Sequence, residues 1–108
     1  MTRVVVEAGA CGFTATVEVV RLSARKVSIA LASDCEMVSQ FGKNIRELDW
    51  HHLLRQPGNY LASESIFQCM QHHVSCPVPL AILKAIEVEV GAALPKSVVM
   101  RFENVDYK

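Results

Sequence analysis

The 108-residue chain lacks an excess of charge of either sign. Eleven Lys and Arg side chains balance eleven Asp and Glu side chains. A protein that holds a nucleic acid backbone or an anionic membrane surface usually presents a basic patch. The balanced charge therefore argues against nucleic acid and against membrane as partners.

Long hydrophobic runs are also missing at the N-terminus. Residues 1–13 (MTRVVVEAGACGF) contain three consecutive valines between Arg3 and Glu7. That run is too short for the apolar part of a signal peptide or for a membrane span, so we expect a cytoplasmic protein. In a reducing compartment its four cysteines should be thiols, ligands or redox groups and not a disulfide framework.

Linkers, repeats and low-complexity segments are absent as well, and 51% of the residues are hydrophobic. A chain of this length buries well over half of its unfolded surface around a single core. We expect one α+β domain over residues 1–108. Because the sequence has no Gly-rich phosphate loop, no pair of catalytic carboxylates and no Ser-His-Asp pattern, it does not favour an enzyme.

Alternation of apolar and polar residues predicts four strands. Residues 3–8 and 13–21 form a hairpin across a GACG turn, and residues 26–32 form a third strand. Residues 97–103 (SVVMRFE) alternate in the same way and predict a C-terminal fourth strand. We expect a three-stranded antiparallel β-meander with this last strand as a further member.

Three helices are expected on one face of that sheet. The first is predicted by apolar residues at helical spacing, Val38, Phe41, Ile45 and Leu48. Ser33 or Asp34 would cap it, and residues 50–52 (WHH) would follow in a surface loop. Residues 60–73 predict a second helix, and a third should open at Pro77 and end near Gly91.

Three of the four cysteines fall at the ends of the expected elements. Cys11 lies in the hairpin turn, Cys35 between the third strand and the first helix, and Cys76 at the start of the third helix. Helix N-termini stabilise thiolates, which predicts reactive thiols at the two helix starts. Because a sheet edge and two helix starts can meet at one point, we expect the three sulfurs to share a site. Cys69 lies inside the expected second helix and is assigned to the core.

A histidine adds a fourth candidate ligand. His73 lies three residues before Cys76 and, with the three thiols, would complete a Cys₃His set. Such a set binds zinc, and the same groups are acceptable ligands for the iron of an iron–sulfur cluster. A small structural or interaction domain with inert thiols is the alternative, because free cysteine is among the most buried residue types.

The segments around these cysteines resemble the iron–sulfur cluster assembly scaffolds, IscU and the N-terminal part of NifU. The matching stretches are GACGFTATVEV (9–19), SIALASDCEMV (28–38) and HHVSCPVPLAILKAIEVEV (72–90). The resemblance implies an IscU-like fold, an iron–sulfur cluster or zinc ion as cofactor, and a scaffold or carrier role. It also implies a cysteine desulfurase or a cluster acceptor as partner.

The chain departs from those scaffolds around all three cysteines, and at the second one Asp34 and Glu36 flank Cys35 where the family has glycine. Phe13 follows the Cys-Gly pair where the family has aspartate, and Ser75 precedes the third cysteine where the family has histidine. A second, shorter resemblance joins residues 73–78 (HVSCPV) to the second-cysteine segment of the OsmC and Ohr hydroperoxide reductases. It implies a thiol peroxidase that uses Cys76.

Overall fold

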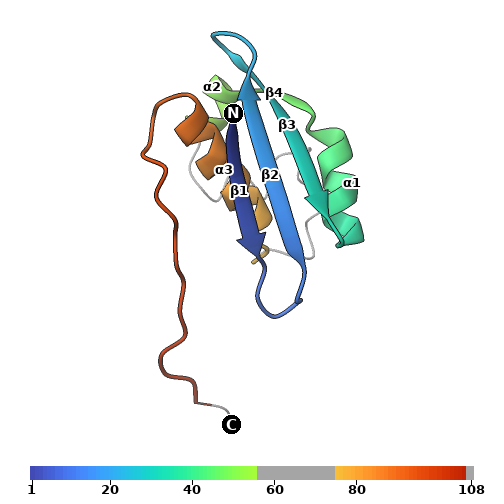
Figure 1. Ribbon diagram of the computed structural model, residues 1–108, viewed down its shortest axis with the longest axis vertical. Coiled ribbons are helices and arrows are strands. Elements are labelled where there is room, and N and C mark those ends of the chain that lie inside the picture. Colours follow the sequence, from blue (N-terminus) through green and yellow to red (C-terminus); the bar gives the residue numbers. More distant parts are fainter. Residues whose placement is uncertain (56–74, 107–108) are drawn as a thin grey trace.

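The computed structural model describes residues 1–55 and 75–106. These residues form an α+β fold in which helices cover one face of an antiparallel sheet of four strands (Figure 1). The strands lie side by side in chain order, β1-β2-β3-β4. The second helix predicted at 60–73 lies outside the described residues, together with Cys69 and His73.

The first three strands confirm the predicted meander. They are β1 (Thr2–Glu7), β2 (Thr14–Arg21) and β3 (Lys26–Ser33). Val17 of β2 lies opposite Val4 and Leu31, so alternate side chains of the three strands share one face. The strand residues buried on that face are Val6, Ala15, Val17, Val19, Val27 and Ile29.

The fourth strand is not the one expected. β4 (Glu47–Asp49) pairs with the start of β3, where Leu48 lies opposite Val27. Residues 97–103 form no strand, and the prediction of a C-terminal strand is wrong. The C-terminal segment runs away from the domain along an exposed path (Figure 1). Alternation shows which way each side chain of a strand would face, but it supplies no partner strand.

Helix α1 (Glu36–Asn44) packs on β3 and is shorter than its apolar spacing predicts. It ends before Leu48, which is half-buried because it belongs to β4. Its N-cap is Cys35, so the prediction of Ser33 or Asp34 as the cap is wrong.

Two further helices follow. α2 (Trp50–Leu54) replaces the predicted surface loop, because the carboxylate of Asp49 accepts a hydrogen bond from the backbone N–H of His51 at 3.0 Å and starts the helix. α3 (Val78–Glu89) confirms the third predicted helix and lies against β1 and β2. None of the described helices is long and apolar enough to cross a bilayer.

The core lies between the inner face of the sheet and helices α1 and α3. Its largest fully buried side chains are Val17, Val19, Val27, Phe41, Ile45, Val78, Ile82 and Ile86. Each such side chain stabilises the fold by roughly 1.5–3 kcal/mol when it leaves water. Gly42 lets α1 approach β3 closely, since a Cβ there would lie 3.0 Å from the Cβ of Leu31.

Candidate thiol site

The three cysteines at element ends line one cavity of about 300 Å³. Cys11 reaches it from the β1–β2 turn, Cys35 from the junction of β3 and α1, and Cys76 from the residue before Pro77, the N-cap of α3. The sheet topology explains the meeting, because the β1–β2 turn and the end of β3 lie at the same end of the sheet. Much of the remaining wall is apolar, with Phe13, Ala15, Met37, Val38 and Val78 among its residues.

Cys11 is the exposed member of the three. It lies in a turn in which the backbone N–H of Gly12 donates to the carbonyl of Gly9 at 2.9 Å. Both glycines have positive φ angles, 82° at Gly9 and 76° at Gly12, which side-chain-bearing residues rarely adopt. A Cβ at either glycine would meet no described atom within 4 Å, so this turn is held by its own backbone and not by packing at those two positions.

Cys35 is half-buried, and Ser33 holds its backbone in place. The backbone N–H of Cys35 donates to the Ser33 hydroxyl at 3.1 Å. The same hydroxyl donates to the carbonyl of Thr14 at 3.1 Å, at the start of β2. Ser33 therefore links Cys35 to the strand that follows the Cys11 turn. From the sequence, Ser33 is expected only as a helix cap, and no sequence pattern reveals this positioning contact.

Cys76 is half-buried, and its environment differs from the one expected at a helix start. Burial raises the pKa of the Cys76 thiol, a hydrogen bond with the backbone of Val78 lowers it, and the charges of Cys11 and Cys35 raise it further. The net pKa is raised, so the expectation of a readily ionised thiolate at this helix start is wrong. Loss of hydration outweighs the favourable backbone contact.

The described thiols do not form a ready coordination shell. Across residues 1–55 and 75–106, no group of three or more His, Cys, Asp or Glu side chains is arranged to hold a metal ion. Cys11, Cys35 and Cys76 are free thiols that share a cavity wall. The predicted ligand His73 lies outside the described residues.

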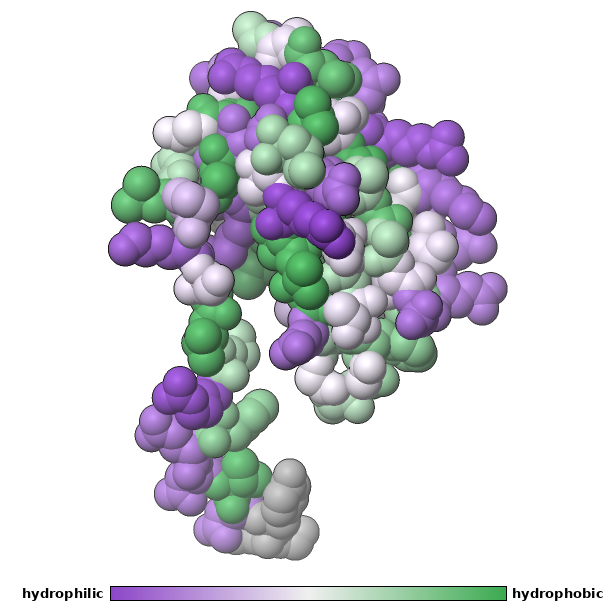
Figure 2. Space-filling model, viewed as in Figure 1, coloured by the Kyte–Doolittle hydropathy of each residue, from purple (hydrophilic) through white to green (hydrophobic). Residues whose placement is uncertain are grey.

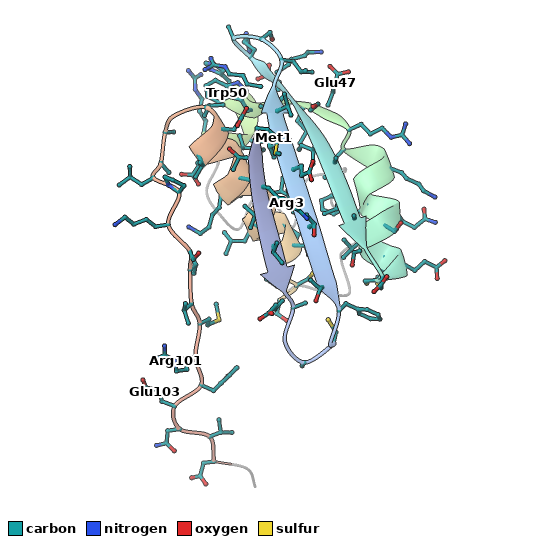
Figure 3. All side chains as sticks on the ribbon, viewed as in Figure 1. Met1, Arg3, Glu47, Trp50, Arg101 and Glu103 are labelled. Atoms are coloured by element: carbon teal, nitrogen blue, oxygen red, sulfur yellow. The ribbon has the colours of Figure 1, made fainter. Side chains whose placement is uncertain are left out.

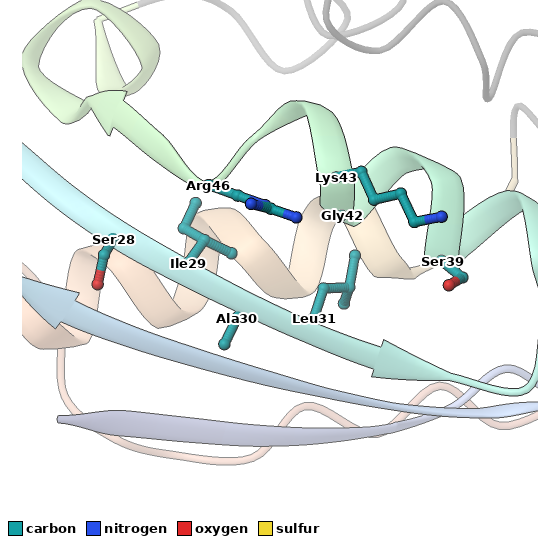
Figure 4. A pocket seen from close by; sticks show the side chains of 8 residues that line it. All are labelled: Ser28, Ile29, Ala30, Leu31, Ser39, Gly42, Lys43 and Arg46. Atoms are coloured by element: carbon teal, nitrogen blue, oxygen red, sulfur yellow. The ribbon is translucent and has the colours of Figure 1, made fainter.

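A second cavity, of about 510 Å³, lies between β3 and α1 (Figure 4). It is lined by Ser28, Ile29, Ala30, Leu31, Ser39, Gly42, Lys43 and Arg46. Its polar side chains are two cations and two hydroxyls, without a thiol, imidazole or carboxylate. The thiol cavity is the stronger candidate because thiols are groups that can bind metals and can act as nucleophiles.

The chain matches a known protein family over most of its length. The model of a family described as "Family of unknown function (DUF6951)" matches residues 2–102. That range includes all four cysteines, the whole described sheet and most of the C-terminal segment. No curated protein and no solved structure matches the chain.

Proposed function

Because the chain belongs to DUF6951, a family of unknown function, we propose its function from the thiol site: it binds an iron–sulfur cluster or a zinc ion through three cysteines. Cys11, Cys35 and Cys76 are the proposed ligands, and His73 is the proposed fourth. The observation that supports this function is the single cavity lined by thiols from three separate elements. The bound group would serve a scaffold or carrier role or would stabilise the fold.

The electrostatics of the cavity favour a cation. Burial raises the pKa of Cys76 most, and the charges of Cys11 and Cys35 raise it further, so three thiolates together are unfavourable there without a positive partner. A divalent cation reverses that repulsion, and thiolates are the ligands preferred by zinc and by iron–sulfur clusters. Apolar lining residues such as Met37 and Val38 strengthen the attraction, because they lower the local dielectric.

Binding requires the thiols to move closer than they lie in the described structure. The turn that bears Cys11 is the part best able to move, because among the described residues a Cβ at Gly9 or Gly12 would meet no atom within 4 Å. Cys35 is restrained through Ser33, and Cys76 by the start of α3. We infer that loading draws the Cys11 turn toward the other two cysteines.

Free thiols fit a reducing compartment, and we infer a cytoplasmic location. For a bound cluster, the expected partners are a cysteine desulfurase that donates sulfur and a protein that accepts the cluster. An IscU-like fold belongs to the same proposal, on the basis of the meander, the cysteines at element ends and the long helix after Cys76.

The test is metal and sulfide quantitation on protein purified without oxygen. We expect about one zinc ion or one cluster per chain. Cys11→Ser, Cys35→Ser and Cys76→Ser should each lower the metal content severely. Cys69→Ser is the matched control and should leave the metal content unchanged. His73→Ala should weaken binding without abolishing it, because three thiolates remain. Affinity should rise with pH, since binding displaces thiol protons.

Protein that binds no metal, or that keeps the same content in all four serine variants, would contradict the proposal. The same variants test the thiol peroxidase alternative. The raised pKa of Cys76 disfavours that activity, because the thiolate is the form that attacks peroxide. We expect negligible thiol-dependent peroxide consumption. Turnover that is lost in Cys76→Ser and does not depend on metal would replace metal binding with peroxidase chemistry.

A further inference from the structure

The C-terminal arm, residues 92–106, leaves large apolar side chains in water. The exposed fractions of Val99, Met100 and Phe102 are 72%, 84% and 87%. Figure 2 shows the arm as a projection with hydrophobic residues, separate from the body of the domain. Each such side chain forgoes the free energy that burial of its apolar surface would provide. A segment of this composition is expected to be covered by another surface.

The arm has the pattern of a β-strand. Val98, Met100 and Phe102 would face one side, and Val99, Arg101 and Glu103 the other. Residues 96–106 contain neither Gly nor Pro. The arm therefore has the sequence pattern of a β-strand, but it has no partner strand among the described residues.

The edge of the sheet offers such a partner. β1 is the first strand of the sheet, and no described strand pairs with its outer edge. On the helix-free face β1 presents Arg3, Val5 and Glu7, and Figure 3 shows Arg3 on that face. On the inner face, Val6 is buried and Val4 packs against the core. An edge strand of this kind is a template for pairing with another chain.

We propose that the C-terminal arm of one copy pairs antiparallel with β1 of a second copy, and that the exchange is reciprocal. In the register that pairs Glu103 with Arg3, Arg101 lies opposite Val5, with Glu7 on one of its diagonals and Arg3 on the other. The same register places Phe102 opposite Val4 and Met100 opposite Val6. Apolar residues then meet on the face that continues the core, and Glu103 meets the unlike charge of Arg3 on the open face.

A second copy fits this pairing better than the same chain does. The arm leaves α3 next to the start of β1, where Glu89 accepts a hydrogen bond from the Thr2 hydroxyl. From there it runs in the same direction as β1 (Figure 1), so pairing within one chain would be parallel. Antiparallel pairing is the more stable per residue, and two copies related by a twofold axis provide it.

The first experiment measures the mass of the wild-type full chain in solution across a dilution series by analytical ultracentrifugation. We expect a dimer that dissociates on dilution. Arg3→Glu and Glu103→Arg should each raise the dimer dissociation constant by about tenfold, because each puts like charges at both exchanged strands. Both side chains are exposed, so far-UV circular dichroism should stay unchanged. Glu36→Arg on α1 is the matched control and should dimerise as the wild type does.

Mixing the two weakened variants distinguishes exchange between chains from pairing within one chain. In a heterodimer, the glutamate introduced at position 3 of one copy meets the arginine introduced at position 103 of the other. The unchanged Arg3 and Glu103 meet at the second exchanged strand, so both charge pairs are restored. We expect the mixture to dimerise with near wild-type affinity. A mixture no more dimeric than its separate components, or a wild-type protein that is monomeric throughout, would overturn the proposal.

An apolar variant gives an independent check. Met100→Ser combined with Phe102→Ser should weaken the dimer more than either charge reversal, since it removes the buried side of the exchanged strand. Both side chains are exposed in the described chain, so the variant monomer should fold as the wild type does. Unchanged dimerisation in this variant would also overturn the proposal.

Discussion

Glu89, at the end of α3, accepts hydrogen bonds from the first and the last strand residues of the β1–β2 hairpin. Its carboxylate accepts hydrogen bonds from the Thr2 hydroxyl at 2.7 Å and from the backbone N–H of Arg21 at 3.0 Å. The ammonium group of Met1 lies 3.3 Å away. These contacts, led by the Arg21 N–H, hold the pKa of Glu89 below its usual value. One carboxylate therefore joins α3 to β1 and to the end of β2.

This contact predicts a pH-dependent loss of stability. Because the pKa of Glu89 is lower in the folded chain than its ordinary value of 4.5, its stabilising contribution is complete well above pH 4.5 and is lost as the pH falls through the folded pKa. Glu89→Gln should lower the free energy of unfolding at pH 7 by roughly 1–3 kcal/mol. Urea unfolding across a pH series should show the two proteins converging in acid.

Glu87→Gln, on the same helix, is the control and should have a much smaller effect at every pH. A difference between wild type and Glu89→Gln that stays constant from pH 7 into the acid range would show that the carboxylate charge is not the cause.

At the scale of elements, the contact between α1 and β3 depends on the absence of a side chain. Gly42 faces Leu31 so closely that an added Cβ would sit 3.0 Å from the Leu31 Cβ, which belongs to the stem of that side chain and cannot swing away. Glycine is an unfavourable residue within a helix, by about 1 kcal/mol relative to alanine. Close packing of the helix on the strand is the gain that offsets this cost.

Gly42→Val should therefore lower the free energy of unfolding by roughly 1–3 kcal/mol, because the helix must move away from the strand. Ser39→Val, three residues earlier in α1, is exposed and should cost only a few tenths of a kcal/mol from helix propensity. Urea denaturation of both variants measures the difference. Equal losses would mean that the contact with Leu31 does not limit the packing.

The strands that alternation predicts correctly are those whose partners are their neighbours in the chain. β1, β2 and β3 are joined by short turns, so a period of two and a turn are sufficient to predict them. β4 has only three residues, too few to show a period. Leu48 sits at helical spacing after Ile45, but its burial comes from β4. The spacing of Leu48 therefore fits a helix, although its burial comes from a strand, and the pattern alone does not distinguish the two.

In the candidate site, too, the features that depend on chain order could be predicted from the sequence, and those that depend on packing could not. The placement of cysteines at element ends could be predicted because it needs only the order of the elements, and Cys11, Cys35 and Cys76 do line one cavity. The pKa of Cys76 could not be predicted from the sequence. A helix start favours the thiolate while burial opposes it, and only the packed structure shows that burial outweighs the helix start. The role of Ser33 depends on Thr14, which lies 19 residues away and becomes its neighbour through strand pairing.

At the scale of the whole molecule, the thiol cavity requires contacts across most of the chain. The turn that bears Cys11 and the start of α3 at Cys76 are separated by 65 residues. Contacts of such long separation form late, since the chain loses entropy in closing the loop before the contact stabilises it. Protection of Cys76 during refolding should therefore rise at the rate of global folding.

Pulsed labelling with a thiol reagent at alkaline pH, followed by mass spectrometry of the Cys76 peptide, measures that rate. Cys11 is the internal control, because it is exposed in the folded chain and should remain labelled throughout. Protection of Cys76 well before the change in tryptophan fluorescence would mean that burial of this thiol needs only local structure.

The spacing of the three cysteines also has a consequence during synthesis. The ribosome releases Cys11 and Cys35 before Cys76 exists, and helix α3, which follows Cys76, is made later still. A metal or cluster delivered to the growing chain would meet two thiols and no cavity. If the three thiols bind a metal or cluster as proposed, all three can take part only once α3 has been made and has packed on the sheet. A protein that loads the site would then have to recognise a surface that only the folded domain presents.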